Sequence, residues 1–314
     1  MTDEKKISND AASIRQRLYN LSKQQGEDFS FIISRFAVER FLFRLSHSPY
    51  ADRFVLKGAQ LFHLWTDKIQ RPTRDLDLLG TDESSVFNVE EIFRKICSHP
   101  VNVPDGLEFL PTTVQGEEIR EQAEYSGVRI RLKYQLGQIK DSLQVDIGFG
   151  DIVTPSPLEM EYGSLLDLPS ARLMVYPKES VVSEKFQAMV MLGMGNSRMK
   201  DFFDLFIMAR EFEFDGKILL QAIKLTFKRR NTALPVERPF VLSSEFTNNP
   251  EKLAQWKAFL KRTGLETEDT DLTTVIQLLG EFLLTPVKKH LGGQHFNKLW
   301  PPGGPWKTKK RSQS

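Results

Sequence analysis

The chain has almost no cysteine: Cys97 is the only one among 314 residues. A lone cysteine cannot form an internal disulfide, and its isolation favours a reducing, cytoplasmic compartment. No apolar run reaches the roughly 20 residues of a membrane-spanning helix, so no membrane partner is expected. The segment Met1–Lys6 also lacks the apolar core of a signal peptide.

The chain also has little excess charge of either sign. Its formal net charge is +2, so overall charge does not argue for nucleic acid, and any basic footprint must be local. A length of 314 residues and a hydrophobic content of 40% are sufficient for two ordinary domains, each with a sizeable core.

Hydrophobic periodicity divides the chain into a mixed first part and a helical second part. Strands are expected at 54–56, around 75–79, and at 107–114, 127–136 and 143–149. Helices are expected at 11–25, 31–45, 89–97, 180–192, 197–210, 215–230, 250–262 and 271–284. Arg40 is interpreted as part of a solvated helix face. The proline, glycine and lysine content of 301–314 predicts a disordered basic tail.

Two aspartates are separated by one residue within a short apolar strand. Side chains alternate along a strand, so Asp75 and Asp77 should share one face while Leu76 and Leu78 enter the core. Adjacent acids repel each other, and a divalent cation between them would relieve that repulsion. The alternative is a polar strand end whose acids pair with Arg71 and Arg74.

A third acid, Asp146, lies on the polar face of a later strand with Gln144 and Gly148. Three carboxylates on one face of a sheet can bind two Mg²⁺ ions about 4 Å apart. Carboxylate and phosphate oxygens suit Mg²⁺ (or Mn²⁺), and the five histidines show no metal-ligand spacing. The acids therefore predict metal-dependent chemistry on a polyphosphate.

A glycine turn precedes the acid pair. Lys57, Gly58 and Ala59 connect a short strand to an expected helix starting near Gln60, which is an arrangement that can present backbone N–H groups to an anion. A simple strand-to-helix connection would leave the same pattern. The strand at 127–136 carries a cationic face that could guide an acceptor: Arg129, Arg131 and Lys133.

The helical part contains a second polar cluster. Asp201 and Asp204 share a helix face, and Lys200 can pair with Asp204 four residues later. Lys185 lies in an otherwise apolar helix, where it can contact phosphate as a point charge or simply lie at the surface.

Taken together, these motifs resemble the AbiEii/AbiGii nucleotidyltransferase toxin family, which belongs to the DNA polymerase β-like nucleotidyltransferase superfamily. The matching segments, in order, are Lys57-Gly58-Ala59, Arg71–Asp77, Val145–Asp151, Glu184-Lys185 and Arg198–Leu205. The resemblance covers most of the chain, from about Arg15 to Arg262.

The resemblance implies a bilobed α+β fold with an N-terminal nucleotidyltransferase lobe on a small mixed sheet and a helical C-terminal lobe. The corresponding domains are 1–175 and 176–300, followed by the tail 301–314. The metal ligands it implies are Asp75, Asp77 and Asp146, and Lys185 and Asp204 join them as catalytic residues. The nucleotide-binding residues it implies are Lys57, Gly58, Arg71, Arg74, Lys185, Lys200 and Asp201.

The activity implied by the family is transfer of a nucleoside monophosphate from an NTP to a hydroxyl of RNA (a tRNA 3′ end is one candidate) or of protein. The family's members are toxins of toxin–antitoxin and abortive-infection systems, which implies a DNA-binding antitoxin encoded nearby and a role in phage defence. Ala59 stands where the superfamily often has serine. That departure keeps a second reading open, a catalytically silent nucleotide- or RNA-binding module. A metal-dependent phosphohydrolase or nuclease is a third.

Overall fold

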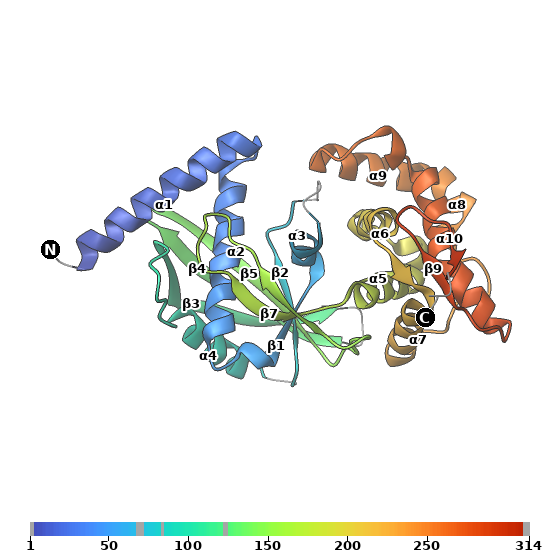
Figure 1. Ribbon diagram of the computed structural model, residues 1–314, viewed down its shortest axis with the longest axis horizontal. Helices are drawn as coiled ribbons and strands as arrows, with labels where there is room; N and C mark the ends of the chain where they lie inside the picture. Colours follow the sequence, from blue (N-terminus) through green and yellow to red (C-terminus); the bar gives the residue numbers. More distant parts are fainter. Residues whose placement is uncertain (1–2, 67–71, 83–84, 122–124, 310–314) are drawn as a thin grey trace, which may run out of the picture. The chain divides into compact units, whose positions relative to one another are not determined.

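Figure 1 shows a computed structural model of the chain, which describes residues 3–66, 72–82, 85–121 and 125–309. The chain divides into two compact units. The first comprises Met1–Asp151 with Leu158–Val175, and the second comprises Ile152–Pro157 with Tyr176–Ser314. The assignment of a nucleotidyltransferase domain to residues 1–175 and of a helical domain to residues 176–300 stays a prediction.

A seven-stranded mixed sheet forms the centre of the first unit, in the order β3-β4-β5-β2-β1-β7-β6. Its strands are β1 (Phe54–Lys57), β2 (Leu76–Gly80), β3 (Leu107–Glu121), β4 (Tyr125–Leu136), β5 (Ile139–Phe149), β6 (Leu158–Tyr162) and β7 (Ala171–Val175). β2 pairs with β5, and β1 with β7, in parallel, and the other neighbours are antiparallel. The mixed sheet is confirmed, whereas the expectation that it is small is wrong.

The hairpin of β4 and β5 follows the predicted alternation, but β6 and β7 were not predicted. β6 is a five-residue edge strand that pairs only with β7 within the sheet, and Leu158 at its start is 52% exposed. Because such a strand depends on its partner rather than on an apolar face of its own, its local sequence carries little signal.

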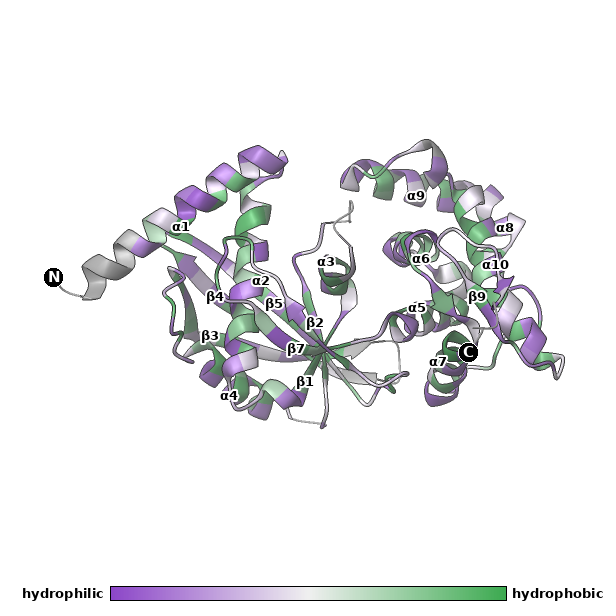
Figure 2. Cartoon of the chain, viewed as in Figure 1, coloured by the Kyte–Doolittle hydropathy of each residue, from purple (hydrophilic) through white to green (hydrophobic). Residues whose placement is uncertain are grey.

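The helices of the first unit are α1 (Asp3–Gln25), α2 (Phe29–His47), the one-turn α3 (Phe62–Trp65) and α4 (Val86–Cys97). Asp28 caps α2 by accepting hydrogen bonds from the backbone N–H groups of Ser30 and Phe31. Since α2 packs against α1, α4, β5 and β7, it is buried on most sides, whereas α1 is largely hydrophilic in Figure 2.

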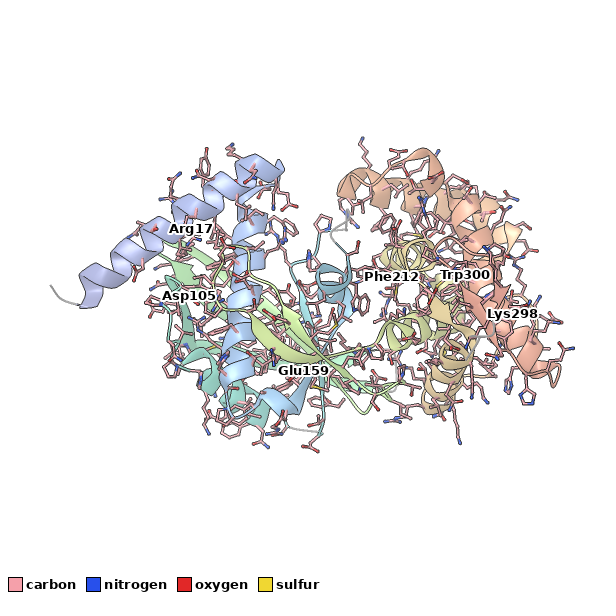
Figure 3. All side chains as sticks on the ribbon, in the orientation of Figure 1. Arg17, Asp105, Glu159, Phe212, Lys298 and Trp300 are labelled. Carbon is pink, nitrogen blue, oxygen red and sulfur yellow. The ribbon has the colours of Figure 1, made fainter. Side chains whose placement is uncertain are left out.

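A buried ionic network connects α2 to the start of β3. Asp105, labelled in Figure 3, accepts from Arg40 Nε at 3.0 Å and from Arg44 Nη1 at 2.7 Å. Burial alone would raise the pKa of Asp105, but the hydrogen bonds and charges of Arg44 and Arg40 bring it below its ordinary value. Arg40 is fully buried, so its assignment to a solvated helix face is wrong.

The second unit contains the helices α5 (Lys178–Leu192), α6 (Met199–Glu211), α7 (Gly216–Arg229), α8 (Ser244–Asn248), α9 (Pro250–Thr263) and α10 (Leu272–Leu291). Short 3₁₀ turns occur across the chain at η1 (Ala51–Arg53), η2 (Gly58–Leu61), η3 (Gly193–Gly195), η4 (Phe240–Leu242) and η5 (Glu268–Thr270). A three-stranded sheet that was not predicted joins β8 (Phe214–Asp215), β9 (Lys298–Trp300) and β10 (Lys307–Thr308).

The C-terminal segment is anchored to this sheet and to α10. Trp300, labelled in Figure 3, is fully buried and donates from Nε1 to the carbonyl of Ala209 at 2.7 Å. Trp306 donates to the carbonyl of Phe282 at 3.2 Å, and its ring centroid lies 5.3 Å from that of Trp300. The prediction of a disordered tail is therefore wrong for residues 301–309, while 310–314 lie outside the described residues.

In the part of the chain that the structure describes, no helix combines the length and the apolar character that crossing a membrane requires. A cytoplasmic location stays a prediction.

Replacement of Asp105 by alanine should destabilise the first unit by about 3–5 kcal/mol, because it leaves Arg40 and Arg44 buried without their carboxylate. Denaturant unfolding measures this loss, and alanine at the exposed Asp52 should change the free energy of unfolding by less than about 0.5 kcal/mol.

The depressed pKa of Asp105 sets the pH dependence of stability. The stabilisation from Asp105 is present above the unfolded-state pKa and is lost as pH falls through the folded-state value. Equal effects at Asp105 and Asp52 would contradict this account.

Candidate active site

Strand β2 separates its acid from its apolar side chains. Leu76 and Leu78 are 0% and 1% exposed, while Asp77 between them is half-buried. Asp75 is exposed and lies one residue before the strand begins. The predicted alternation of acidic and apolar side chains is confirmed.

The register of the sheet aligns five charged residues across five strands. The pairs are Lys57 with Asp77, Asp77 with Asp146, Asp146 with Arg129, and Arg129 with Glu117. Directly paired residues point to the same face of a sheet. These five residues therefore form one line, called the charged row below, in which two carboxylates lie side by side with a cation on each outer side.

Asp75 lies on the same face as the charged row. Gln144 lies two residues before Asp146 on β5, so the two share a face. The Nε2 atom of Gln144 lies 3.4 Å from Oδ1 of Asp75. The structure thus brings Asp75, Asp77 and Asp146 to one side of the sheet, as the sequence predicts.

The glycine turn and the acid strand touch each other. Gly58 has a φ of +76°, which favours glycine, and a Cβ built on it would lie 1.9 Å from Oδ2 of Asp77. The carboxylate of Asp77 therefore occupies the space that any side chain at residue 58 would need. The turn continues into η2 and α3 instead of a long helix, so a helix N-terminus contributes little to anion binding here.

Gln60 holds the backbone of the acid pair in place through its side-chain amide. This residue is 1% exposed, donates from Nε2 to the backbone carbonyl of Asp75 at 3.2 Å, and accepts from the hydroxyl of Tyr162 at 3.0 Å. An amide held in this way is not available to a phosphate. Its role in the structure is to hold the backbone at Asp75.

Lys57 lies below the surface of the site. It is 6% exposed, and its Nζ atom is 3.4 Å from Oδ2 of Asp151, which follows β5. Sequence reasoning did not single out Asp151. Asp151 directly follows Gly150, and nothing in the sequence around it indicates that its partner is a lysine 94 residues earlier in the chain.

Of the two arginines predicted to bind the nucleotide, the structure describes Arg74 but not Arg71. Arg71 lies outside the described residues. Arg74 is exposed and donates from Nη2 to the hydroxyl of Ser30 at 2.8 Å. This contact differs from the alternative interpretation, in which Arg74 would pair with Asp75 or Asp77.

The predicted cationic face of β4 is largely neutralised. Arg129 donates to both carboxylate oxygens of Asp146, at 2.7 Å each, and Arg131 lies 2.8 Å from Glu117. Hydrogen bonding to Asp146, opposed by burial, raises the pKa of Arg129. Of the three predicted cations, only Lys133 has no ion pair recorded among the described residues.

The carboxylates fit a divalent metal by their chemistry. Hard oxygen donors on two adjacent strands suit Mg²⁺ or Mn²⁺. Within residues 3–66, 72–82, 85–121 and 125–309, no three His, Cys, Asp or Glu side chains lie close enough together to coordinate one metal ion as they stand. Asp77 and Asp146 are nevertheless direct neighbours, with Asp75 beside them.

The second unit contains a separate buried cluster. The Nζ atom of Lys185 on α5 lies 2.6 Å from Oδ1 of Asp201 and 3.0 Å from Oδ2 of Asp204, both on α6. Lys185 is thus neither a free surface lysine nor an unpaired phosphate contact. Among the described residues, the expected pairing of Lys200 with Asp204 does not form: Asp204 pairs with Lys185, and Lys200 is exposed.

A second ion pair borders this cluster. Glu184, adjacent to Lys185, lies 3.4 Å from Nη2 of Arg230, and Nη1 of Arg230 donates to Gln187 at 3.1 Å. Arg230 is 7% exposed. The sequence showed no sign of this residue's role, because it lies at the end of α7 among three consecutive basic residues.

Comparison with known proteins gives one family. A family model described as "Nucleotidyl transferase AbiEii toxin, Type IV TA system" matches residues 40–278, which is more than half of the chain. No curated protein matches the chain.

Two solved structures from Helicobacter pylori are similar to the chain. One is the crystal structure of JHP933, with 15% identity, a TM-score of 0.42, and coverage of 81% of this chain and 90% of that one. The other is described as a "putative nucleotidyltransferase", with 15% identity, a TM-score of 0.44, and coverage of 82% and 95%. Because both TM-scores lie below 0.5, family membership rests on the family model.

Alanine at residue 58 should displace the carboxylate of Asp77 and destabilise the first unit. Gly26 is a matched control, since its φ is +68° and a Cβ there meets nothing within 4 Å. Both substitutions incur the cost of a positive φ, about 1 kcal/mol, and Gly58→Ala should cost about 1–3 kcal/mol more through steric conflict. Urea unfolding measures the difference. Addition of Asp77→Ala should recover part of the extra loss, and equal costs at the two glycines would disprove the contact.

Replacement of Lys185 by methionine should destabilise the second unit by about 3–5 kcal/mol, because Asp201 and Asp204 then lose the cation between them. Lys200→Met, on the same helix as the two acids but exposed, should cost less than about 0.5 kcal/mol. Thermal and denaturant unfolding compare the two variants. A Lys185 variant as stable as the Lys200 variant would show that the cluster contributes nothing to folding.

Proposed function

Because the chain belongs to the AbiEii nucleotidyl transferase toxin family of type IV toxin–antitoxin systems, we propose that it transfers a nucleoside monophosphate from an NTP to an RNA hydroxyl. Nucleotidyl transfer is the activity of the family. The acceptor and the metal dependence are the new parts of the proposal. In the reaction, the acceptor oxygen bonds to the α-phosphorus, the bond from the α-phosphorus to the bridging oxygen breaks, pyrophosphate leaves with that oxygen, and the hydroxyl proton passes to solvent.

The observation that carries the proposal is the charged row. It places Asp77 and Asp146 side by side, with Asp75 on the same face and the glycine turn against them. Asp75 and Asp77 are the proposed ligands of Mg²⁺, or of Mn²⁺ in its place, with Asp146 as the third carboxylate. A bound ion would neutralise phosphate charge and lower the pKa of the acceptor hydroxyl.

The backbone turn at Gly58 is the proposed resting place of the phosphates. Residue 58 carries no side chain, and the carboxylate of Asp77 occupies the space that one would need, so a metal-bound phosphate at the turn would lie directly beside this carboxylate. Lys57 lies beneath, paired with Asp151, and is proposed to orient the turn by its charge. Arg74 is exposed beside the acids and is the proposed side-chain contact to phosphate.

The Lys–Asp cluster of the second unit is proposed to take part in nucleotide binding. Lys185 holds Asp201 and Asp204 in fixed positions, which makes it an orienting residue in the nucleotide-free chain. Lys200 is exposed on the same helix as the acids and is the proposed direct phosphate contact there.

RNA is preferred over protein as acceptor because of charge. In the second unit, lysine and arginine outnumber aspartate and glutamate, whereas in the first unit the acids are in excess. Helix α7 has no acidic residue, and Lys217, Lys224 and Lys228 are spaced seven and four residues apart, which places them along one side of the helix. A basic face of this kind suits a phosphate backbone. A tRNA 3′ end is the first acceptor to test.

Membership of the family implies a nucleotide substrate and an antitoxin. We propose that the antitoxin is a DNA-binding protein encoded by a neighbouring gene and that the system acts in phage defence. Transfer of nucleotides to tRNA would stop translation, which gives growth arrest a direct chemical cause.

Incubation of the protein with each α-³²P-labelled NTP, Mg²⁺ and total RNA should transfer label to RNA and release pyrophosphate in equal amount. Asp77→Asn should lower the rate at least about 100-fold, because it removes a metal ligand. Asp141→Asn, an exposed position on β5 outside the charged row, should leave the rate unchanged. Label on protein would identify a protein acceptor. Release of phosphate or shortened RNA would indicate hydrolysis, and NTP binding without pyrophosphate release would indicate a silent binding module.

A further inference from the structure

The second unit contains an open pocket along helix α10, which is labelled in Figure 1. The pocket has a volume of about 300 Å³, at the lower end of the size range of ligand pockets. Its wall is formed by one face of α10, from Gln277 to Lys288, and by Arg238 from the loop before η4. Gly280 and Glu281 lie between the two ends of that face. This site is called the α10 pocket below.

Arg238 is held at the α10 pocket by two contacts within the second unit. Its Nε atom donates to the backbone carbonyl of Leu242. Its Nη2 atom occupies the space beside Gly280, where a Cβ built on the glycine would lie 2.3 Å from it. Glycine is less favourable than alanine in the interior of a helix. Gly280 therefore lowers helix stability and leaves a fixed place for the guanidinium.

The charges of the α10 pocket do not cancel. Arg238, Glu281 and Lys288 are exposed, and in the part of the chain that the structure describes none of the three has an ion pair. Two cations and one acid leave a net charge of +1. A phosphodiester carries one negative charge, whereas an NTP or pyrophosphate carries several. One phosphodiester therefore matches the charge of the pocket, and Glu281 would repel a polyphosphate.

The other polar groups of the pocket suit RNA. The fork of an arginine can donate to two oxygens of one phosphate, and a lysine adds a point charge. The carboxylate of Glu281 and the side-chain amide of Gln277 are acceptors four residues apart on the same face of α10. They can receive a hydrogen bond from the 2′-hydroxyl of a ribose next to the bound phosphate, and DNA lacks this donor.

We propose that the α10 pocket binds one phosphodiester of a single RNA strand, with Arg238 as the two-point phosphate contact and Lys288 as the second cation. Glu281 accepts from the neighbouring 2′-hydroxyl and excludes polyphosphates. The inference rests on the proposed RNA acceptor and deepens it, because it gives the second unit a defined place to hold that RNA. The pocket binds the strand, and no bond is made or broken there.

Binding of a labelled single-stranded RNA of about 12 nucleotides, followed by fluorescence anisotropy without NTP, tests the inference apart from any reaction. Arg238→Gln should raise the Kd about tenfold. It should also reduce the slope of log Kd against log salt by about 0.7, the share of one phosphate contact on a single strand. Arg262→Gln is the matched control, because Arg262 is exposed at the end of α9 and outside the pocket. Its Kd should stay within about twofold of wild type.

A second variant moves the guanidinium without removing any charge. Gly280→Ala places a Cβ where Nη2 of Arg238 lies, so this flexible side chain must shift, while the helix gains a better helix former. The Kd for RNA should rise about fivefold as the two-point contact is lost. Thermal unfolding should show a fold at least as stable as the wild type. In the Arg238→Gln background, Gly280→Ala should have no further effect on RNA binding, because the two residues act through one contact.

Other ligands identify the source of the phosphate. A DNA strand of the same sequence should bind more weakly than the RNA, and Glu281→Ala should narrow that difference. Equal binding of RNA and DNA by the wild type would overturn the assignment to RNA. Arg238→Gln should leave the Kd values of ATP and pyrophosphate unchanged. Weaker polyphosphate binding by this variant, with RNA binding intact, would make the pocket a polyphosphate site and overturn the inference.

The outcomes distinguish the inference from the function beneath it. The inference fails if Arg238→Gln binds RNA like the wild type, if Arg262→Gln weakens binding equally, or if Gly280→Ala has no effect. The proposed function would survive each of these results, because label transfer from NTP to RNA is measured separately. RNA binding that depends on Arg238, in a chain that transfers no nucleotide, would support the inference and refute the enzyme. A wild-type chain that binds no RNA would overturn both the inference and the RNA acceptor.

Discussion

The parallel pairing of β2 with β5 is the contact on which the candidate site depends, because it sets Asp77 directly beside Asp146. Like charges opposite each other in a sheet are destabilising by roughly 0.2–1 kcal/mol. The next strand on each side supplies a cation, Lys57 on β1 beside Asp77 and Arg129 on β4 beside Asp146. The attraction within these two pairs opposes the repulsion between the two carboxylates. The sheet can therefore fold with its acids adjacent before any ligand arrives.

The rest of the site is built to keep these acids in place. The carboxylate of Asp77 fills the space beside Gly58, and Gln60 holds the backbone of Asp75 while it accepts from Tyr162 on β6. β6 is a short edge strand that the sequence pattern does not predict. Its Tyr162 nevertheless completes the chain of hydrogen bonds that runs through Gln60 to the backbone of Asp75. Fixed donors and acceptors of this kind reduce the reorganisation that a reaction requires.

In the second unit, packing between helices decides which charges meet. The pairing of Lys200 with Asp204 expected from helix spacing is worth only about 0.2–0.5 kcal/mol at a surface. The apolar residues around Lys185 bring α5 against α6, and Lys185 then reaches Asp201 and Asp204 in a largely buried setting. A buried charge must be paired, so the long-range contact prevails over the local one.

The sequence by itself determined the features that depend on near neighbours. These are the alternation around Asp77, the hairpin of β4 and β5, the glycine turn at residues 57–59, and the motifs of the family, since side-chain period and turn composition are local properties. Tertiary structure alone decided that the sheet has seven strands, that the segment through Trp306 is packed, and that Arg129 faces Asp146 rather than an acceptor. Register and burial depend on residues far apart in the chain, and no local pattern records which of them meet.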